Sequence, residues 1–408
     1  MNNRVVITGV GLATPLGNTA ALFTDQLLSA QSHIQLNDYD GEDFAVGRVL
    51  DDLDIKDAHR FSKADRATLF ALHASRQAFE DAGIAHHGVD RHEFAVFLGA
   101  GLAGAIKLED SYRRMFQQGN KRVRPSTVLN GMANAPSAQL SIEHGIKGPS
   151  MNISSACSSS SVAILQGVDH VRKDAGNVAI VGGTEALLAY GHLKAWQATG
   201  ALTQTRQEEG FFCSPFSQHR NGMVLGEGSV VFVLENLAQV KASGRPFYAE
   251  VAGGAITSNA THMVQSDFDG QVRVMKQAMD SAGISPQQVD YINAHATATI
   301  TGDPIEAKAI ASLFSQAPQK CMVSSIKGAC GHLLGASGAI GILATILSMK
   351  ADRLPPNTGC QTVDPEFDIA VVNGVGETRM ESEYALSNSF AFGGHNCSLV
   401  LRNAKGLA

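Results

Sequence analysis

The nonapeptide RQAFEDAGI at residues 76–84 returns almost unchanged as KQAMDSAGI at residues 276–284. In both places a Val-Asp pair follows in the same register, and then a strand-like apolar run, FAVFLGAG (94–101) or YINAHATA (291–298). The shift, 276 minus 76, is 200 residues, which is too long for the repeat of a solenoid. Helix, turn and strand in one order twice predict two copies of one α/β unit, although two unrelated α/β domains sharing a common turn remain an alternative.

The repetition extends to a second pair of motifs, MNISSAC (151–157) and MVSSIKGACGH (322–332), each followed by an apolar helix-period segment. Elsewhere strand-length apolar runs alternate with helical ones, which favours α/β layers around buried sheets. The copies join near ENLAQVKASGRP, so we expect halves at residues 1–243 and 244–408. Two related halves would pack about a pseudo-twofold axis and bring equivalent loops together.

The composition excludes several classes of function. The net charge of the 408 residues is -6 and no long Lys/Arg run occurs, which argues against nucleic acid or an anionic membrane as the partner. No segment has 18 uninterrupted apolar residues and no signal peptide is visible, so we expect a soluble, cytoplasmic protein. Six cysteines lie scattered without paired spacing, which indicates a reducing compartment and no disulfide framework or zinc site.

One cysteine lies in a setting suited to nucleophilic chemistry. Cys157 stands among serines, just ahead of a segment with one apolar helical face: Val162, Leu165, Val168 and Val171. The unpaired N–H groups of a helix N-terminus lower the pKa of a thiol, and small neighbours leave room for a substrate. The alternative is that Cys157 is a small buried hydrophobe beside capping serines.

Two histidines occupy matching places in the second copy. His295 ends an apolar strand, and His332 lies in a loop of small residues that opens a Gly- and Ala-rich helix. By the repeat, His332 corresponds to Cys157, so pseudo-symmetry brings them together and favours catalysis over two ordinary core histidines. Asp303 and Glu306 have a structural explanation, because their spacing predicts an N-cap and a capping box.

The segment NSFAFGGHN (388–396) places a Phe- and Gly-rich loop between two strand-like runs. Paired glycines allow positive φ and close backbone approach, so an N–H here is expected to point into a cavity. An exposed Phe392 beside Gly393 is expected to act as a mobile gate. The alternative is an ordinary turn between strands.

Taken in order, Cys157 in SSACSSS, His295 in NAHATATITGDPIEA, Lys327 and His332 in SSIKGACGHLLGASG, and NSFAFGGHN resemble the elongating β-ketoacyl-acyl carrier protein synthases of the thiolase-like superfamily. The resemblance covers essentially the whole chain and includes RNGMVLGEGS (220–229). It implies a five-layer αβαβα fold made of two pseudo-symmetric halves. Initiating synthases typically pair the cysteine with His and Asn, so two histidines point to the elongating type.

The resemblance implies a decarboxylative Claisen condensation in fatty acid or polyketide-like elongation. Cys157 would accept the acyl group, with the backbone N–H groups of Cys157 and Phe392 holding the oxyanion. His295 and His332 would then stabilise the enolate formed from a malonyl thioester. The family further implies that Lys327 organises polar groups near His332, that Thr297 and Thr299 bind the phosphopantetheine arm, and that Phe392 and Gly393 border the substrate.

The resemblance also implies partners. No resident cofactor or metal is expected, since phosphopantetheine arrives on an acyl carrier protein. Carrier proteins are acidic, so basic side chains should line the docking rim; the candidates are Lys63, Arg66, Lys121, Arg122, Arg124 and Arg206. Each also fits an ordinary solvated face. Family members are dimers, so we expect a homodimer or a heterodimer with a related ketosynthase-like subunit.

The chain departs from the family pattern at several places. Ala296 and Ala391 stand where glycine is usual, which would restrict the gate, and Gly341 stands where many members carry a Glu that pairs with the lysine. Ser217, Asn221 and His395 are further departures. None removes the Cys-His-His set, so an active enzyme is expected, working on unusual acyl chains.

Four other functional interpretations of the sequence are less well supported. FLGAGLAG contains GxGxxG after a strand, but no acidic ribose ligand follows a second short strand, which argues against a dehydrogenase. A zinc site at Cys330 and His332 lacks paired spacing. A thiolase would need a late CxG loop, which FGGHNCS does not match. A silent chain-length partner would typically lack the cysteine.

Overall fold

The computed structural model describes residues 3–49, 53, 64–84, 91–117, 119, 122–174, 176–204, 211–314, 321–373 and 381–407. Within them the main sheet has 11 strands in the order β12-β11-β10-β13-β14-β9-β1-β8-β6-β4-β5, beside a 3-stranded sheet β2-β3-β7. The strands are β1 Val5–Ala13, β2 Ile34–Tyr39, β3 Glu42–Gly47, β4 Phe94–Gly99, β5 Ser150–Ile153, β6 Val178–Glu185, β7 Leu225–Gly226, β8 Gly228–Asn236, β9 Ala249–Ser258, β10 Val289–Asn293, β11 Met322–Ser324, β12 Ala370–Val371, β13 Tyr384–Ala391 and β14 His395–Asn403.

The main sheet consists of two five-stranded units with the same topology, and β12 extends the second. In β1-β8-β6-β4-β5 the first two pairings are antiparallel and the last two are parallel. The order β9-β14-β13-β10-β11 repeats this pattern pairing for pairing. The units join where β1 pairs with β9, and the chain passes between them through α9 (Leu237–Ala242). The predicted duplication is therefore confirmed, while the division at residues 243 and 244 stays a prediction.

The repeated nonapeptides form equivalent helices. The first ends α3 (Arg66–Asp81) and the second ends α10 (Phe268–Ala282). Gly83 and Gly283 follow with φ of 67° and 69°, the left-handed conformation in which glycine closes a helix without strain. The sequence match therefore records one helix-terminating turn used twice.

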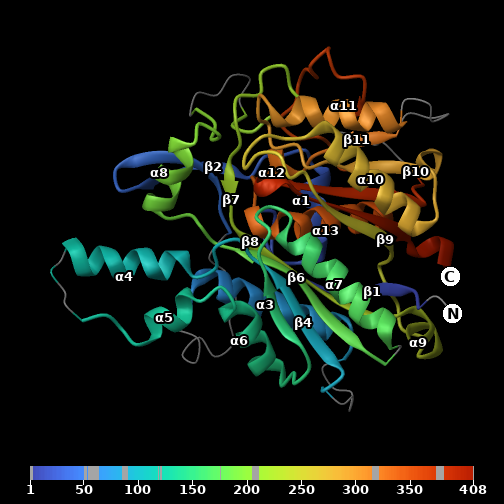
Figure 1. Cartoon of the computed structure of the whole chain (residues 1–408), viewed down its shortest axis with the longest axis horizontal. Helices are drawn as coiled ribbons and strands as arrows, with labels where there is room; N and C mark the ends of the chain where they lie inside the picture. Colours follow the sequence, from blue (N-terminus) through green and yellow to red (C-terminus); the bar gives the residue numbers. More distant parts are fainter. Residues whose placement is uncertain are drawn as a thin grey trace.

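Helices and sheet alternate in five layers. Apolar side chains of α7 (Ser159–Lys173) and α13 (Ser337–Ala351) fill the central core between the two sheet units. Helices α3 and α6 (Ala135–His144) cover the outer face of the first unit. Helices α10 and α11 (Gly302–Phe314) cover the second, and Figure 1 shows α13 near the middle of the molecule. The five-layer fold expected from the sequence is confirmed.

The two central helices touch at their first turns. A Cβ added at Gly338 of α13 would lie 2.0 Å from Ser161 Oγ of α7, so only glycine permits this approach. Ser160 Oγ accepts a hydrogen bond from Ala339 N at 2.9 Å across the same contact. One apolar stretch, Leu334–Ala351, is long enough to cross a membrane, but 89% of it is buried inside the protein. Packing therefore accounts for its hydrophobicity.

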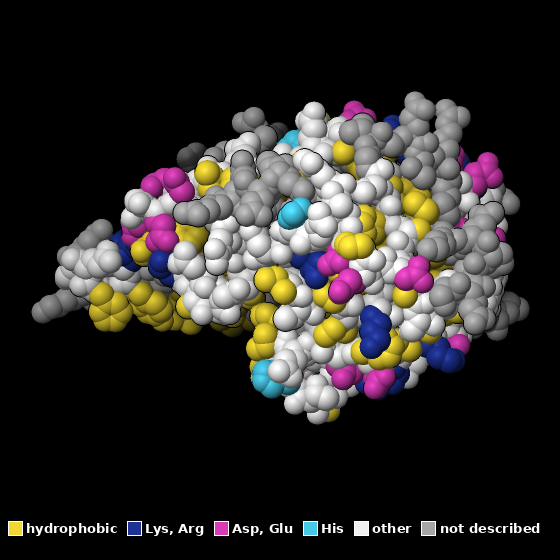
Figure 2. All heavy atoms as spheres, turned by 90° about the horizontal axis from the view of Figure 1, so that it is seen from above, with side chains coloured by type: hydrophobic (Ala, Val, Ile, Leu, Met, Phe, Trp, Pro, Cys, Tyr) yellow, Lys and Arg dark blue, Asp and Glu magenta, His cyan; other side chains and the backbone are white. Residues whose placement is uncertain are grey.

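The short helix α12 (Lys327–Cys330) is buried. Four further helices are α1 (Ala20–Leu28), α4 (Ala105–Gln117), α5 (Ser126–Gly131) and α8 (Tyr190–Ala198). Helices α4 and α5 project as an arm, and Figure 2 shows hydrophobic side chains gathered along one edge of it. Large apolar side chains exposed on or beside the arm are Leu102, Tyr112, Phe116, Val128, Leu129 and Met132. Exposed apolar patches of this kind mark interaction surfaces.

Candidate active site

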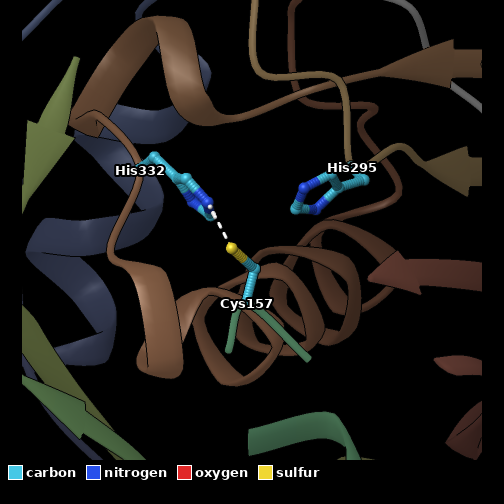
Figure 3. Close-up of side chains that lie close together, drawn as sticks. All are labelled: Cys157, His295 and His332. Carbon is cyan, nitrogen blue, oxygen red and sulfur yellow. Dashed lines mark hydrogen bonds between the residues drawn. The ribbon is translucent and has the colours of Figure 1, made fainter. Parts of the chain in front are cut away.

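Three side chains from opposite halves of the fold converge in one cavity. The sulfur of Cys157 and one ring nitrogen from each of His295 and His332 all lie within 4.8 Å of one another (Figure 3). His332 Nε2 is 3.1 Å from Cys157 Sγ, and the two imidazole centroids are 5.3 Å apart. The cavity has a volume of about 400 Å³, and Thr297, Thr299 and Phe392 also line it. The convergence predicted from the repeat is confirmed.

Cys157 is presented by a sharp turn at the start of α7. The preceding Ala156 has a φ of 50°, a left-handed conformation that is strained for alanine. Ser159, the first residue of α7, holds the turn, because its Oγ donates to Ala156 O at 2.6 Å and accepts from Ser155 N at 2.9 Å. The helix start was predicted correctly from the sequence, and small neighbours permit the sharp turn, but the strain at Ala156 was not foreseen.

The backbone N–H groups around Cys157 act on the pKa of its thiol in the expected direction, but burial outweighs them. Burial raises the pKa of the Cys157 thiol to about 12, although Lys327 and the backbone N–H groups of Phe392 and Cys157 act in the opposite direction. Removing the thiolate from water outweighs these favourable groups. Burial therefore favours the thiol form of Cys157, whereas Lys327 and these N–H groups favour the anion.

His332 is fixed on both sides. It follows α12, its backbone N–H donates to Val224 O at 2.7 Å, and Nδ1 is 2.7 Å from the hydroxyl of Ser337, the first residue of α13. When Ser337 donates to Nδ1, the ring hydrogen lies on Nε2, which faces Cys157. Burial, and then the charge of Lys327, lower the pKa of His332 well below its usual value, so the ring is neutral.

His295 is held through its backbone. Its N–H donates to Glu306 Oε1 at 2.9 Å, and its carbonyl accepts from the buried Lys327 ammonium. Burial, then Lys327, then His332 lower the pKa of His295 well below its usual value. Both imidazoles are therefore neutral hydrogen-bond donors. Gly341 leaves no acidic partner for Lys327 at that position. Burial lowers the pKa of Lys327, and the charge of Glu306 opposes this shift in part.

The predicted capping box at the start of α11 is wrong. Glu306 accepts from the backbone N–H groups of His295 and Ala296, at 2.9 and 2.7 Å. Asp303 accepts from those of Thr297, Thr299 and Phe216. The two carboxylates therefore shape the loop after β10 instead of capping their own helix. Buried carboxylates with several N–H donors satisfy that loop's polar backbone, and burial raises the pKa of Glu306 to about 7 and of Asp303 to about 6.

The Phe392 loop lies over the nucleophile. Its backbone N–H favours the Cys157 thiolate, and its ring stacks on Trp196 of α8 at a centroid distance of 5.9 Å. The expected exposed gate is therefore half-buried against a second aromatic ring. Gly393 and Gly394 have φ of 84° and 73°, which fits the predicted role of the paired glycines. Ala391 has a φ of -114°, which alanine adopts without strain.

Sequence reasoning missed the contribution of Glu185. This buried carboxylate ends β6 and accepts from the N–H groups of Gly101, Leu102 and Gly335, which ties loops of the two halves together. Two N–H groups of the GxGxxG stretch are therefore already bound within the protein. Gly99, the first glycine of that motif, packs against the start of α7, because a Cβ there would lie 2.3 Å from Ser160 N. A dinucleotide-binding loop at this place is excluded.

The carrier-binding candidates remain predictions. Lys63, Lys121 and Arg206 lie outside the described residues. Arg66 forms an ion pair of 2.7 Å with the buried Glu227, which gives it a structural role. Arg122 and Arg124 are exposed beside α5.

Comparisons with known proteins identify the family of the chain. The family model for the N-terminal domain of beta-ketoacyl synthases matches residues 2–240, and that for the C-terminal domain matches residues 248–361. The 3-oxoacyl-[acyl-carrier-protein] synthase 2 of Staphylococcus aureus (strain N315) is 34% identical over 98% of this chain and 98% of its own. The chloroplastic 3-oxoacyl-[acyl-carrier-protein] synthase II of Arabidopsis thaliana is 34% identical over 97% of this chain and 75% of its own.

Solved structures give the same picture. A chain of AntDE:AntF, a type II PKS acyl-carrier protein in complex with its ketosynthase bound to the hexaketide, superposes with a TM-score of 0.90 at 26% identity, covering 99% of this chain and 100% of that one. A chain of the ketosynthase ApeO in complex with its chain length factor ApeC, from Xenorhabdus doucetiae, gives 0.85 at 26% identity and covers 98% of both chains.

Proposed function

Because the chain belongs to the β-ketoacyl synthase family, we propose that Cys157, His295 and His332 divide the two halves of its reaction between them. The enzyme is a carbon–carbon bond-forming acyltransferase. It condenses an acyl group with malonyl-acyl carrier protein by decarboxylative Claisen chemistry and gives a β-ketoacyl-acyl carrier protein.

In the first half-reaction, Cys157 sulfur attacks the carbonyl of an acyl thioester and loses its proton. The backbone N–H groups of Cys157 and Phe392 hold the tetrahedral oxyanion. The carbon–sulfur bond to the carrier then breaks, and the phosphopantetheine thiol leaves with a proton. Burial disfavours a negative charge in this site, whereas these N–H groups and Lys327 stabilise it. They therefore lower the barrier to this step.

In the second half-reaction, the two neutral imidazoles donate to the thioester oxygen of the malonyl group. The carbon–carbon bond to the carboxylate breaks and CO₂ leaves. The electron pair of that bond stays on the malonyl carbon and forms the enolate. The enolate carbon attacks the acyl carbonyl on Cys157, and the sulfur departs as thiolate and regains a proton. Loss of one such donor typically costs about 3–4 kcal/mol, so two donors account for a large part of the decarboxylation rate.

The substrate arm enters past the loop after β10. The hydroxyls of Thr297 and Thr299, 3.1 Å apart on the cavity wall, bind the phosphopantetheine arm. That arm arrives on the acyl carrier protein, so the chain needs no resident cofactor and no metal. We place the enzyme in the cytoplasm.

The apolar edge of the α4–α5 arm supports a dimer. A stable interface buries roughly 800 Å² on each partner, and its core is apolar. Related solved chains are found with an acyl-carrier protein in one structure and with a chain length factor in another. Both a homodimer and a heterodimer with a ketosynthase-like subunit fit this edge.

The 3.1 Å approach of His332 Nε2 to Cys157 Sγ, with His295 in the same cavity, carries the proposal. The test is mass spectrometry of the intact protein after incubation with a panel of acyl carrier thioesters. An acyl mass gain is expected that disappears in Cys157→Ser. No gain with any donor would contradict the acyl-enzyme, and undiminished CO₂ release from malonyl carrier by His295→Ala and His332→Ala would contradict the imidazole roles.

A further inference from the structure

Trp196 is the one tryptophan in the sequence, and its ring lies over the catalytic loop. The indole and the Phe392 ring stack with an interplanar angle of 25°, and both line the cavity that contains Cys157. Trp196 also packs on the apolar cluster that includes Cys157 and Met223. The known reaction leaves this aromatic contact without a role.

The backbone of the loop is held on both sides of Phe392. Before it, Ala391 of β13 pairs with His395 of β14. Gly393 N donates to Met263 O at 2.7 Å, and Asn259 N donates to Gly394 O at 2.9 Å. Gly393 and Gly394 both have positive φ, so the chain turns immediately behind the phenylalanine. These hydrogen bonds hold the backbone behind Phe392, and the stack on Trp196 holds the Phe392 ring.

Helix α8, which carries Trp196, is attached to the rest of the fold at two places. Leu193 anchors it in the core with 1% of its surface exposed. Lys194 of α8 forms a solvent-exposed ion pair with Glu42 of β3 at 3.0 Å, and Gln197 donates to the same carboxylate at 3.2 Å.

We propose that Trp196 is a positioning residue for acyl transfer: its stack on Phe392 holds the loop so that the Phe392 backbone N–H stays aimed at the oxyanion formed on Cys157. This inference rests on the proposed function. An oxyanion donor is effective only at hydrogen-bond distance from the developing charge, so a ring contact that fixes the loop controls the acylation rate. Trp196 acts through Phe392 and need not touch the reacting atoms.

The test compares two reactions of the same sulfur. Acyl transfer from a thioester passes through an oxyanion, whereas iodoacetamide reacts at a saturated carbon, with loss of iodide and the thiol proton and with no oxyanion. The rate of each is measured at Cys157 by mass spectrometry on the full chain, with Cys157→Ser as the blank. The ratio of the acylation rate to the alkylation rate isolates the oxyanion contribution from damage to the fold.

In Trp196→Ala the ratio should fall about tenfold, since an aromatic pair contributes up to the free energy of a tenfold change. Trp196→Phe keeps a ring and should stay within about twofold of the native ratio. Ile142→Ala, an exposed side chain of α6 that does not line this cavity, is the control and should leave the ratio unchanged.

An unchanged ratio in Trp196→Ala, or an equal fall in Trp196→Phe, overturns the inference while the proposed function stands. A native chain that alkylates but accepts no acyl group from any thioester overturns the proposed function and this inference with it.

Discussion

Gly338→Ala tests whether the contact between α7 and α13 holds the site together. The new methyl group would lie 2.0 Å from Ser161 Oγ, 2.9 Å from Ser161 N and 3.0 Å from Ser160 Oγ. Ser161 cannot yield freely, because its hydroxyl is hydrogen-bonded to Ser389 Oγ at 2.9 Å. The helices must therefore separate or that hydrogen bond must break.

The magnitude follows from two opposing contributions. Overpacking a core costs about 1–3 kcal/mol, and replacing glycine by alanine in a helix returns up to about 1 kcal/mol. We therefore expect Gly338→Ala to lower the free energy of unfolding by about 1–2 kcal/mol. Because Cys157 precedes α7 and His332 precedes α13, separating the helices should also lengthen their 3.1 Å contact and slow acyl transfer.

The double variant identifies the cause. Ser161→Ala alone loses one buried hydrogen bond, about 1 kcal/mol, but removes the atom nearest the new methyl group. The contacts with Ser161 N and Ser160 Oγ remain, so Gly338→Ala with Ser161→Ala should recover part of the loss, a coupling of about 1 kcal/mol in a double-mutant cycle from urea unfolding. Additive losses in the double variant, or native stability in Gly338→Ala, would refute the reasoning.

Three further outcomes follow from the site. Ser337→Ala removes the hydroxyl that selects the Nε2–H form of His332, so CO₂ release from malonyl carrier should fall up to about tenfold while Ser337→Thr retains activity; equal rates in the alanine variant would exclude this role. Lys327→Met removes a charge that lowers the pKa of both imidazoles, so those pKa values should rise. The acid limb of the pH profile of decarboxylation should then move up by about one pH unit, whereas Lys327→Arg should keep the native limb. A shift of the limb to lower pH would contradict this expectation. Glu306→Gln turns an acceptor into a donor facing a backbone N–H, so unfolding free energy in urea should fall by about 1–3 kcal/mol and CO₂ release should fall with it; native values of both would show that the carboxylate does not shape the loop.

The fold was largely predictable because its two halves repeat the same sequence pattern. The matching nonapeptides that end at residues 84 and 284 and the motifs around Cys157 and His332 repeat in register, so local pattern and global topology agree. The same repeat placed Cys157 and His332 at equivalent helix starts, which is why their contact could be foreseen. The resemblance to a family added the reaction, and the comparisons confirm it.

What the sequence could not show depends on contacts between distant residues. Asp303 and Glu306 have the spacing of a capping box, yet tertiary structure turns both carboxylates toward the loop after β10. The pKa of Cys157 depends on burial, which a helix-start pattern does not report. Trp196 and Phe392 are 196 residues apart along the chain, so no local signal pairs their rings.

The position of the last hairpin has a consequence for biosynthesis. β13 and β14 enter the sheet between β10 and β9, strands made well before them, and the loop at their tip is the one that lies over Cys157. Every described strand from β1 to β12 is therefore synthesised before the loop that lies over the Cys157 sulfur. A nascent chain that ends before β13 has no Phe392 N–H, so we expect it to accept no acyl group until β13 and β14 have entered the sheet.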